Sequence, residues 1–414
     1  MEFIAVLKSR KLLSLLFLGF ASGLPLFLTS RTLQVWLTEA GVDLGVIGWL
    51  SLVRLPYTLK FLWSPFLDRF VPPFLGRRRG WLVLTQIGLM IAIACMAFQN
   101  PKQALNILAI NALIIAFLSA TQDIAGDAYR TDVLETAELG LGASTWILGY
   151  RVAILTTSSV ALVLADYLPW SVIYLLMAVL MGVGIIAAFF APEPIDQERS
   201  PDSLIDAIYL PFQEFFQRKG IIFGIVILAF ILLFKFGDSL LGNMATPFLV
   251  DIGFSKKVIG TVQGGWGFVA TTVGVVLGGA VLTKIGLNRA LWVVGICQAL
   301  SNLSYLGLSL VGKSETALLI VVSIENICAG MVASVFVAYL MSLCNQKFSA
   351  TQFALLSSLM AAGNDILSAP AGELAKILGW SNFFASTIAL SVPGMLLLFF
   401  VAPWSQRSLR QSEE

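Results

Sequence analysis

Two carboxylates in the stretch TQDIAGDAYRTDVL, residues 121–134, are spaced so that together they could bind and release a proton. Asp123 and Asp127 are four residues apart, which places both side chains on one face of a helix. Two acids this close in a low dielectric cannot both stay ionised cheaply, so one of them is expected to take up a proton near neutral pH. The alternative is structural: Asp127 would pair with Arg130, and Asp123 would cap a neighbouring helix.

Acidic residues later in the chain extend this chemistry into its second half. In FKFGDSLLGN, Lys235 and Asp238 lie one helical turn apart and could neutralise each other. A silent buried ion pair is often no more stable than apolar packing, so a functional role is favoured. Glu325, in SIENICAGM, has no local partner and is expected to be protonated or paired across a cavity with Lys235. Asp123, Asp127, Asp238 and Glu325 are therefore the predicted proton-coupling residues.

Four cationic side chains in the first half could form a basic wall for an anionic ligand: Arg31, Arg54, Lys60 and Arg151. Arg suits planar carboxylate or phosphate groups because its guanidinium holds them with two hydrogen bonds. Charges within a membrane are costly and almost always face a bundle interior or a water-filled cavity. The competing interpretation is that individual cations pair with Asp123 or Asp127 between helices.

An aromatic residue on a glycine-rich segment, Trp266 in QGGWG, offers a flat surface on which a sugar ring could stack. Tight helix packing explains the neighbouring glycines equally well. The predicted substrate-binding residues are Arg31, Arg54, Lys60, Gln122, Arg151, Lys235, Gln263, Trp266 and Asn326.

Composition places these residues in a lipid bilayer. Of the 414 residues, 58% are hydrophobic and 12% charged, whereas a soluble protein carries about 25% charged residues. The chain has no histidine, which excludes a Ser-His-Asp triad, an HExxH zinc helix and a histidine proton relay. Its four cysteines share no CxxC spacing and are expected to be packing residues rather than disulfides or metal ligands. We therefore expect a membrane protein that is not an enzyme, with no cofactor, no metal and no nucleic-acid partner.

Twelve apolar segments are long enough to cross the hydrocarbon layer as helices. They are expected near 12–36, 45–66, 80–98, 104–130, 141–164, 168–191, 221–249, 258–283, 289–311, 316–343, 352–376 and 381–403. The longest polar interruption divides them into two groups of six, which predicts an N-terminal bundle at 1–191, a cytoplasmic linker at 192–220 and a C-terminal bundle at 221–414. Within the linker, SLIDAIYLPFQEFF has the spacing of a helix lying along the membrane surface. Lys and Arg concentrate at the span ends on the side of the N-terminus, so both termini are expected in the cytoplasm.

Charges inside the spans recur with a period of three helices. The first, fourth, seventh and tenth expected spans carry interior charges, whereas the third, sixth, ninth and twelfth have none. This is the internal repeat scheme of major facilitator transporters, which predicts an all-α integral membrane protein with twelve transmembrane helices in two six-helix halves. The loop SPFLDRFVPPFLGRRRGW, residues 64–81, also resembles the G-x-x-x-D-R-x-G-R-R loop of that superfamily. Asp68, Arg69, Arg77 and Arg78 could latch the inner gate of one half, and a plain anchor of cytoplasmic positive charge is the alternative.

Several stretches resemble the AmpG family of bacterial muropeptide permeases. They are FASGLPLFLTSRTLQVWL (20–37), FLWSPFLDRFVPPFLGRRRGWL (61–82), SATQDIAGDAYRTDVL (119–134), LGYR (148–151), KFGDS (235–239), IEN (324–326) and LCNQKFSATQFALLS (343–357). The resemblance implies proton-driven import of GlcNAc-1,6-anhydro-MurNAc, with or without its stem peptide, from periplasm to cytoplasm by alternating access. It further implies an inner-membrane protein, expected to be a monomer, that serves cell-wall recycling and, in some bacteria, β-lactamase induction.

Other interpretations stay open at this point. Acetyl-CoA carriers of endomembranes look like distant relatives, so another bulky organic anion could be the substrate, although phosphate-rich CoA would demand more Arg than four scattered cations. A membrane acyl- or glycosyltransferase would need a nucleophile with a base, or a metal-binding acid cluster, which Asp123 and Asp127 could resemble. A transporter-like receptor would bind muropeptide without accumulating it.

Overall fold

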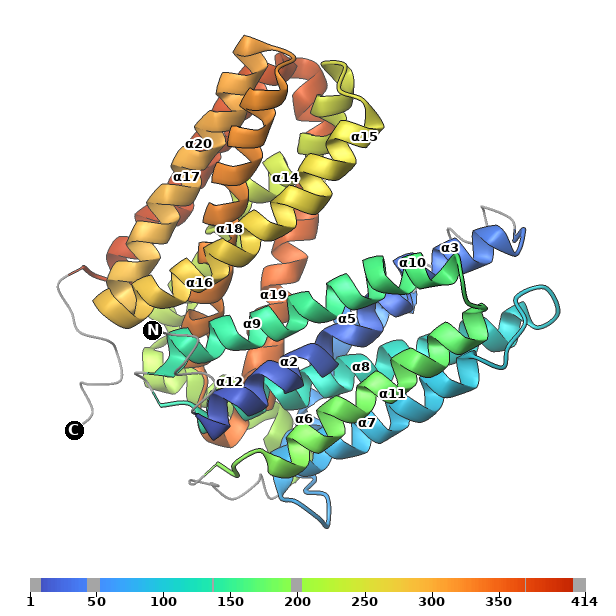
Figure 1. Ribbon diagram of the computed structural model, residues 1–414. Helices are drawn as coiled ribbons and strands as arrows, with labels where there is room; N and C mark the ends of the chain where they lie inside the picture. Colours follow the sequence, from blue (N-terminus) through green and yellow to red (C-terminus); the bar gives the residue numbers. More distant parts are fainter. Residues whose placement is uncertain (1–8, 43–52, 136–137, 195–202, 369, 405–414) are drawn as a thin grey trace. The chain divides into compact units, whose positions relative to one another are not determined.

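The computed structural model describes residues 9–42, 53–135, 138–194, 203–368 and 370–404, apart from the side chains of Arg31, Lys256, Lys257 and Asp365. All regular elements within these ranges are helices (Figure 1), which confirms the all-α prediction.

Ten segments within the described residues are long and apolar enough to cross a membrane as helices. They are Arg10–Glu39, Arg77–Met96, Leu105–Val133, Leu139–Ala165, Trp170–Phe190, Ile221–Asp251, Gly260–Ile285, Leu287–Val311, Glu315–Leu343 and Ala371–Val401. Nine of them overlap one expected span each, and Ala371–Val401 overlaps the last two. The chain is therefore a multi-pass membrane protein.

The expected span at 45–66 is built from shorter pieces. It begins in residues 43–52, which lie outside the described part of the chain. It continues as α5 (Leu55–Leu59), η2 (Lys60–Leu62) and α6 (Ser64–Arg69). Both α-helices have a proline in their first turn, where a missing backbone N–H does no harm but a preceding helix cannot continue smoothly.

The expected span at 352–376 is also divided. It comprises α19 (Ser349–Ser368) and the first turns of α20 (Ala371–Val401). Within α20, Gly379 has a φ of 70°, so the helix is interrupted there. Glycine adopts this left-handed conformation without steric cost. The interruption at Gly379 therefore separates the eleventh expected span from the twelfth.

Contacts between residues divide the chain into two compact units. Unit 1 comprises Met1–Glu135, Thr145–Phe212 and Cys344–Leu355, and unit 2 comprises Thr136–Ser144, Gln213–Leu343 and Leu356–Glu414. Each unit thus includes a short segment from the opposite half of the sequence.

In unit 1, four long helices pack together around an apolar core. Both α8 (Leu105–Val133) and α11 (Trp170–Phe190) pack against α7 (Arg77–Met96), and α2 (Arg10–Leu28) also contacts both α8 and α11. Small and branched apolar side chains from these helices form one continuous buried cluster. This packing holds the carboxylates of α8 next to α2.

Two glycines of α2 allow a close approach of α9 (Leu139–Leu155). Gly19 lies against the backbone carbonyl of Trp146, and Gly23 lies against that of Tyr150. A side chain at either position would collide with these carbonyl groups. Small residues at helix contacts are the usual means by which membrane helices pack tightly.

In unit 2, α16 (Gly267–Ile285), α17 (Leu287–Val311) and α18 (Glu315–Leu343) pack side by side (Figure 1). Both α17 and α14 (Phe236–Asp251) also pack against α20. A second buried apolar cluster lies between these helices.

Two irregular segments interrupt the helices of unit 2. The seventh expected span is broken between α13 (Ile221–Leu233) and α14, with Lys235 at φ −104° and ψ 12° immediately before α14. A π-helical segment, η5 (Gly260–Trp266), precedes α16. Breaks and π-helical turns in helices are frequent at functional sites.

The linker contains the helix that its spacing predicts. This helix, α12 (Leu204–Lys219), exposes the apolar side chains of Ile205, Ile208 and Tyr209. Its position along the membrane surface stays a prediction.

Candidate functional site

Asp127 on α8 is the centre of a buried charge cluster in unit 1. Its Oδ2 atom lies 3.1 Å from Lys60 Nζ, and its Oδ1 atom lies 2.7 Å from Arg130 Nη2. The guanidinium of Arg130 also lies over the rings of Trp146 and Phe353, at 5.2 and 4.9 Å from their centroids. Both cation pairings that the sequence left open for Asp127 are therefore formed.

Asp123, one turn earlier on α8, has different partners. Its Oδ1 atom accepts a hydrogen bond of 2.5 Å from Ser22 Oγ on α2. The residue is half-buried, and among the described residues no Lys or Arg forms an ion pair with it. The two carboxylates thus share a helix face, but cations hold Asp127 whereas a hydroxyl group holds Asp123.

The other unit 1 residues predicted to bind substrate are dispersed. Arg54, immediately before α5, is exposed, whereas Arg151 on α9 is half-buried. Gln122 is fully buried, and its amide nitrogen and oxygen have no hydrogen-bond partner in the described part of the chain. The side chain of Arg31 lies outside the described residues. Of the four predicted cations, the structure joins Lys60 to an aspartate.

A second charge cluster in unit 1 forms around Arg78, which is 2% exposed. Its Nη1 atom lies 2.9 Å from Asp68 Oδ1, its Nε atom lies 2.7 Å from Asp132 Oδ2, and its Nη2 atom donates to Ser349 Oγ at 2.7 Å. The other oxygen of Asp68 accepts a hydrogen bond of 2.8 Å from the backbone N–H of Thr351. Asp68 therefore caps the N-terminus of α19, where free N–H groups and the helix dipole attract an anion.

Three of the four predicted latch residues gather at the segment Cys344–Leu355, and one does not. Arg77 donates to the backbone carbonyls of Gln346 and Lys347 at 3.3 and 3.4 Å. Arg69 lies instead over the ring of Phe70. Sequence reasoning did not assign Asp132 to this cluster, although it stands in the stretch that holds the acidic pair.

Three polar side chains of α14 form hydrogen bonds to neighbouring elements, and we call them the α14 strip: Ser239, Asn243 and Thr246. The first two bond to α19 at Asn364 Oδ1 and Ser368 Oγ, both at 2.8 Å. Thr246 donates to Gln263 Oε1 at 3.0 Å. Their spacing places them on one helix face. Gln263 is one of the residues predicted from the sequence to bind substrate, whereas none of the three strip residues is.

The predicted residues of α18 and η5 lie close to one another. Trp266 is 46% exposed, and its Nε1 atom donates to Ser323 Oγ at 2.7 Å. Asn326 donates to Glu325 Oε2 and accepts from Thr271 Oγ1, both at 2.8 Å. An accessible indole therefore stands beside hydrogen-bonding groups that could orient a polar ligand.

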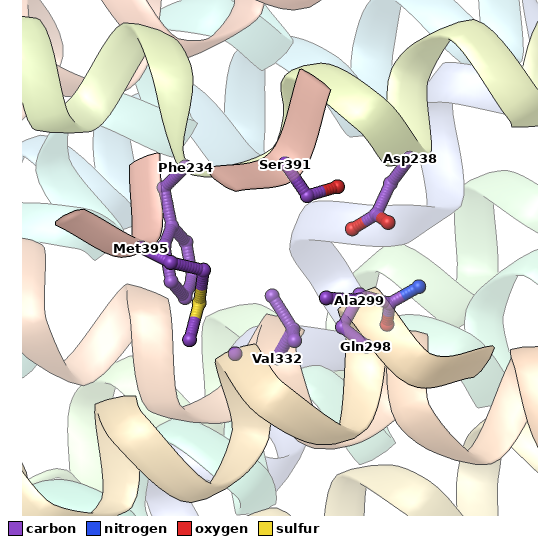
Figure 2. A pocket seen from close by; sticks show the side chains of 8 residues that line it. Phe234, Asp238, Gln298, Ala299, Val332, Ser391 and Met395 are labelled. Carbon is purple, nitrogen blue, oxygen red and sulfur yellow. The ribbon is translucent and has the colours of Figure 1, made fainter. Parts of the chain in front are cut away.

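Lys235 and Asp238 do not form the ion pair that their spacing left open as the structural alternative. Within the described part of the chain, neither these residues nor Glu325 form an ion pair. Lys235 stands at the helix break before α14, so a spacing of three residues does not bring the two side chains together. Asp238 instead borders a small pocket together with Gln298 of α17 (Figure 2).

The chemistry available differs between the units. Unit 1 carries paired and unpaired acids with several cations, which suits proton transfer and the binding of carboxylates. Unit 2 carries an exposed indole and a strip of uncharged hydrogen-bonding groups, which suits sugar rings and amides. Both sets are typical of a carrier for a polar organic substrate.

Sequence comparison places the chain among transport proteins. The Major Facilitator Superfamily pattern matches residues 15–364. The chain is 46% identical over 399 residues to the anhydromuropeptide permease of Escherichia coli strain K12, covering 96% of this chain and 81% of that protein. It is 36% identical to the putative transporter AmpG 4 of Rickettsia felis, covering 96% of this chain and 97% of that protein.

Solved structures with a similar fold are also transporters. The human organic anion transporter MFSD10 superposes with a TM-score of 0.68 at 17% identity, covering 94% of this chain and 99% of that one. The proton:xylose symporter XylE superposes with a TM-score of 0.68 at 13% identity, covering 96% and 95%. At such identities the likeness concerns the fold alone.

Proposed function

The chain belongs to the Major Facilitator Superfamily and, within it, to the family of the anhydromuropeptide permeases, and from this premise we propose that it imports anhydromuropeptides together with protons. The predicted family resemblance and the predicted major facilitator fold are both confirmed. Its relatives are permeases and transporters.

One observation carries the proposal: the 46% identity to an anhydromuropeptide permease extends over 96% of this chain. The proposed substrate is GlcNAc-1,6-anhydro-MurNAc, with or without its stem peptide, moving from periplasm to cytoplasm by alternating access. The proposed location is the bacterial inner membrane with both termini in the cytoplasm. Two halves, 1–191 and 221–414, would be joined by the linker 192–220 in a monomer.

The chemistry of each unit supports this substrate. An anhydromuropeptide combines sugar rings with a peptide that carries carboxylates and amides. In unit 1, Arg54 and Arg151 would bind carboxylates. In unit 2, Trp266 would stack on a sugar ring, and the α14 strip would hydrogen-bond to hydroxyl or amide groups.

We assign the transported proton to Asp123 rather than to Asp127. Both oxygens of Asp127 contact cations, so protonating it would leave Lys60 and Arg130 buried without their counter-charge. Among the described residues, Asp123 forms no ion pair and accepts a hydrogen bond from the hydroxyl of Ser22, which can donate to a carboxylate or accept from a carboxylic acid. Proton binding would reverse that hydrogen bond and so alter the contact between α2 and α8.

The Arg78 cluster would act as a latch on the cytoplasmic side. Asp68 caps α19 in the state described, and this contact would have to break for α19 to move away. The cost of losing this charged helix cap and the hydrogen bond from Arg78 to Ser349 would keep the latch closed until substrate and proton are bound.

Reconstituted transport tests the proposed function. Proteoliposomes with an acidic exterior should accumulate labelled GlcNAc-1,6-anhydro-MurNAc, and an uncoupler should collapse the accumulation. Equal uptake with and without the pH gradient would contradict proton coupling. Binding of the disaccharide without any uptake would indicate a receptor and contradict transport.

Replacing Trp266 with Ala should weaken sugar recognition. Stacking of an aromatic ring contributes about 0.5–1.5 kcal/mol beyond its area burial, which corresponds to a rise in KM of roughly 2- to 10-fold for the disaccharide. Trp266→Phe is the matched control, because it keeps the flat ring and loses only the hydrogen bond to Ser323. An unchanged KM in Trp266→Ala would remove Trp266 from the binding site.

A further inference from the structure

Asp238 occupies an unusual position in unit 2. It lies in the first turn of α14, directly after the break between Leu233 and Phe236. Its Oδ1 atom is shut off from solvent and has no hydrogen-bond partner among the described residues. Lys235, the nearest cation along the chain, forms no ion pair with it. A carboxylate in such surroundings needs a specific explanation, because leaving it charged and unpaired is costly.

Two amides of α17 face this carboxyl group. Gln298 and Asn302 are four residues apart, hence on one helix face, and they are 5% and 0% exposed. Asn302 has neither amide atom in a hydrogen bond, and Oε1 of Gln298 also lacks a partner within the described ranges. Both are side-chain neighbours of the Asp238 carboxyl group. The sequence gives no local partner to any of these buried polar atoms.

A small pocket connects these groups with α20. It is lined by Asp238, Gln298 and Ser391, and otherwise by apolar side chains. Figure 2 shows the Asp238 carboxyl group and the Ser391 hydroxyl pointing toward the same space, with Gln298 beside them. At Gly237 a side chain would collide with Ser391 and with the carbonyl of Thr387. The absence of a side chain there brings α14 onto α20 and the hydroxyl close to Asp238.

This donor set suits a group that changes its protonation state. An amide carries both N–H donors and a carbonyl acceptor. Gln298 and Asn302 can therefore donate to a carboxylate or, after rotation, accept from the O–H of a carboxylic acid. The apolar lining favours the neutral acid, whereas the first turn of a helix favours the charged form. A purely structural carboxylate would be expected to have a fixed cationic partner instead.

Few other ionisable groups act on this site. Lys235 on the same span and Glu325 on α18 carry opposite charges, and both interact electrostatically with Asp238. Cys328 of α18 and Cys297 of α17 are the remaining titratable neighbours within the described residues. Nothing on α20 at the pocket is charged. Asp238 and Glu325 are therefore the two carboxyl groups that can change the charge in this region, and Asp238 is the one that borders the pocket between α14, α17 and α20.

We propose that Asp238 is a proton-binding site in unit 2, and that loss of its proton loosens α14 from α17 and α20 at the helix break beside Lys235. Gln298 and Asn302 are positioning residues that support both protonation states. The inference extends the proposed proton coupling to a second site, but the structural effect that it predicts requires neither substrate nor a gradient.

Hydrogen exchange of the unloaded protein in detergent micelles tests the proposal. Between pH 5 and pH 8, the exchange rate of the backbone amides around the break, residues 233–241, should increase more than that of the amides of α12 in the same molecule. The amides of α12 serve as the reference for the chemical effect of pH on exchange. In Asp238→Asn, which is always neutral, this excess should disappear. Asp251→Asn, at the exposed other end of α14, is the matched control and should keep it.

The outcomes separate this inference from the proposed function. If wild-type exchange at the break follows α12 at every pH, the inference is overturned even where Asp238→Asn fails to fold. The inference is also overturned if a folded Asp238→Asn protein shows the same excess exchange at the break as the wild type. Asn302→Leu should move the pH at which the excess appears, and an unmoved profile would contradict the assigned role of Asn302. The hydrogen-exchange results do not depend on the outcome of the transport assays.

Discussion

Replacing Asp123 with Asn should abolish accumulation of substrate against its gradient while leaving exchange of substrate across the membrane intact. Asn keeps a hydrogen bond to Ser22 but cannot bind or release a proton. One proton moving with each substrate supports about tenfold accumulation for each unit of pH gradient. In Asp123→Asn proteoliposomes the internal concentration should therefore rise only to the external one. Exchange should continue, because it needs the conformational change but no net proton movement.

Replacing Asp127 with Asn should impair both transport and stability, unlike Asp123→Asn. It leaves Lys60 and Arg130 buried with no carboxylate between them, at a cost of roughly 3–5 kcal/mol. Accumulation should fall strongly, and exchange and thermal stability should fall with it. Asp166→Asn is the control, because Asp166 is an exposed acid at the end of α10 (Ala161–Ala165) and should behave as wild type.

The comparison of these variants decides which acid carries the proton. Gradient-driven accumulation by Asp123→Asn at the wild-type level would exclude Asp123 as the coupling group. Full accumulation by Asp127→Asn would remove Asp127 from coupling. Loss of exchange in Asp123→Asn would mean that the residue is needed for the conformational change itself.

Features that depend on neighbouring residues along the chain could be predicted from the sequence. Apolar length predicted the ten spans that the described residues show. The pairing of Asp127 with Arg130 follows from their spacing of three residues on a continuous helix. The same rule failed for Lys235 and Asp238, because α14 begins after Lys235 and the two residues do not share a helix. Spacing rules hold only where the helix is intact.

Contacts between distant segments could not be predicted in the same way. The sequence singled out Asp68 and Arg78 but gave no reason to join them to Asp132 or Thr351. The contact with Asp132 exists only once α7 packs beside α8, and the contact with Thr351 only once the segment Cys344–Leu355 packs within unit 1. Likewise, the sequence does not connect Gln298 of α17 with Asp238 of α14, which border one pocket in the structure. The sequence shows which charged residues lie inside spans, but their partners are determined by tertiary packing.

Replacing Arg78 with Leu should destabilise the protein more than any other charge removal in the segment 64–81. The change leaves Asp68 and Asp132 buried without a counter-charge, which costs roughly 3–5 kcal/mol. The melting temperature and the yield of folded protein should both fall. The stability of Arg78→Lys should lie between that of the wild type and that of Arg78→Leu. An ammonium keeps the positive charge but cannot reproduce the guanidinium fork that contacts Asp68, Asp132 and Ser349 together. Arg69→Leu is the matched control and should change stability little.

A neutral version of the cluster distinguishes a latch from an anchor. The triple variant Asp68→Asn, Arg78→Leu, Asp132→Asn removes all three charges, so the electrostatic penalty disappears and much of the lost stability should return. An amide at position 68 still accepts from the N–H of Thr351, but without the charge that favours a helix N-terminus. If the cluster is a latch, the restored protein should still transport abnormally, with exchange measurable and accumulation leaking away after the gradient is removed. Wild-type accumulation by a stable triple variant would show that the cluster only anchors its helices.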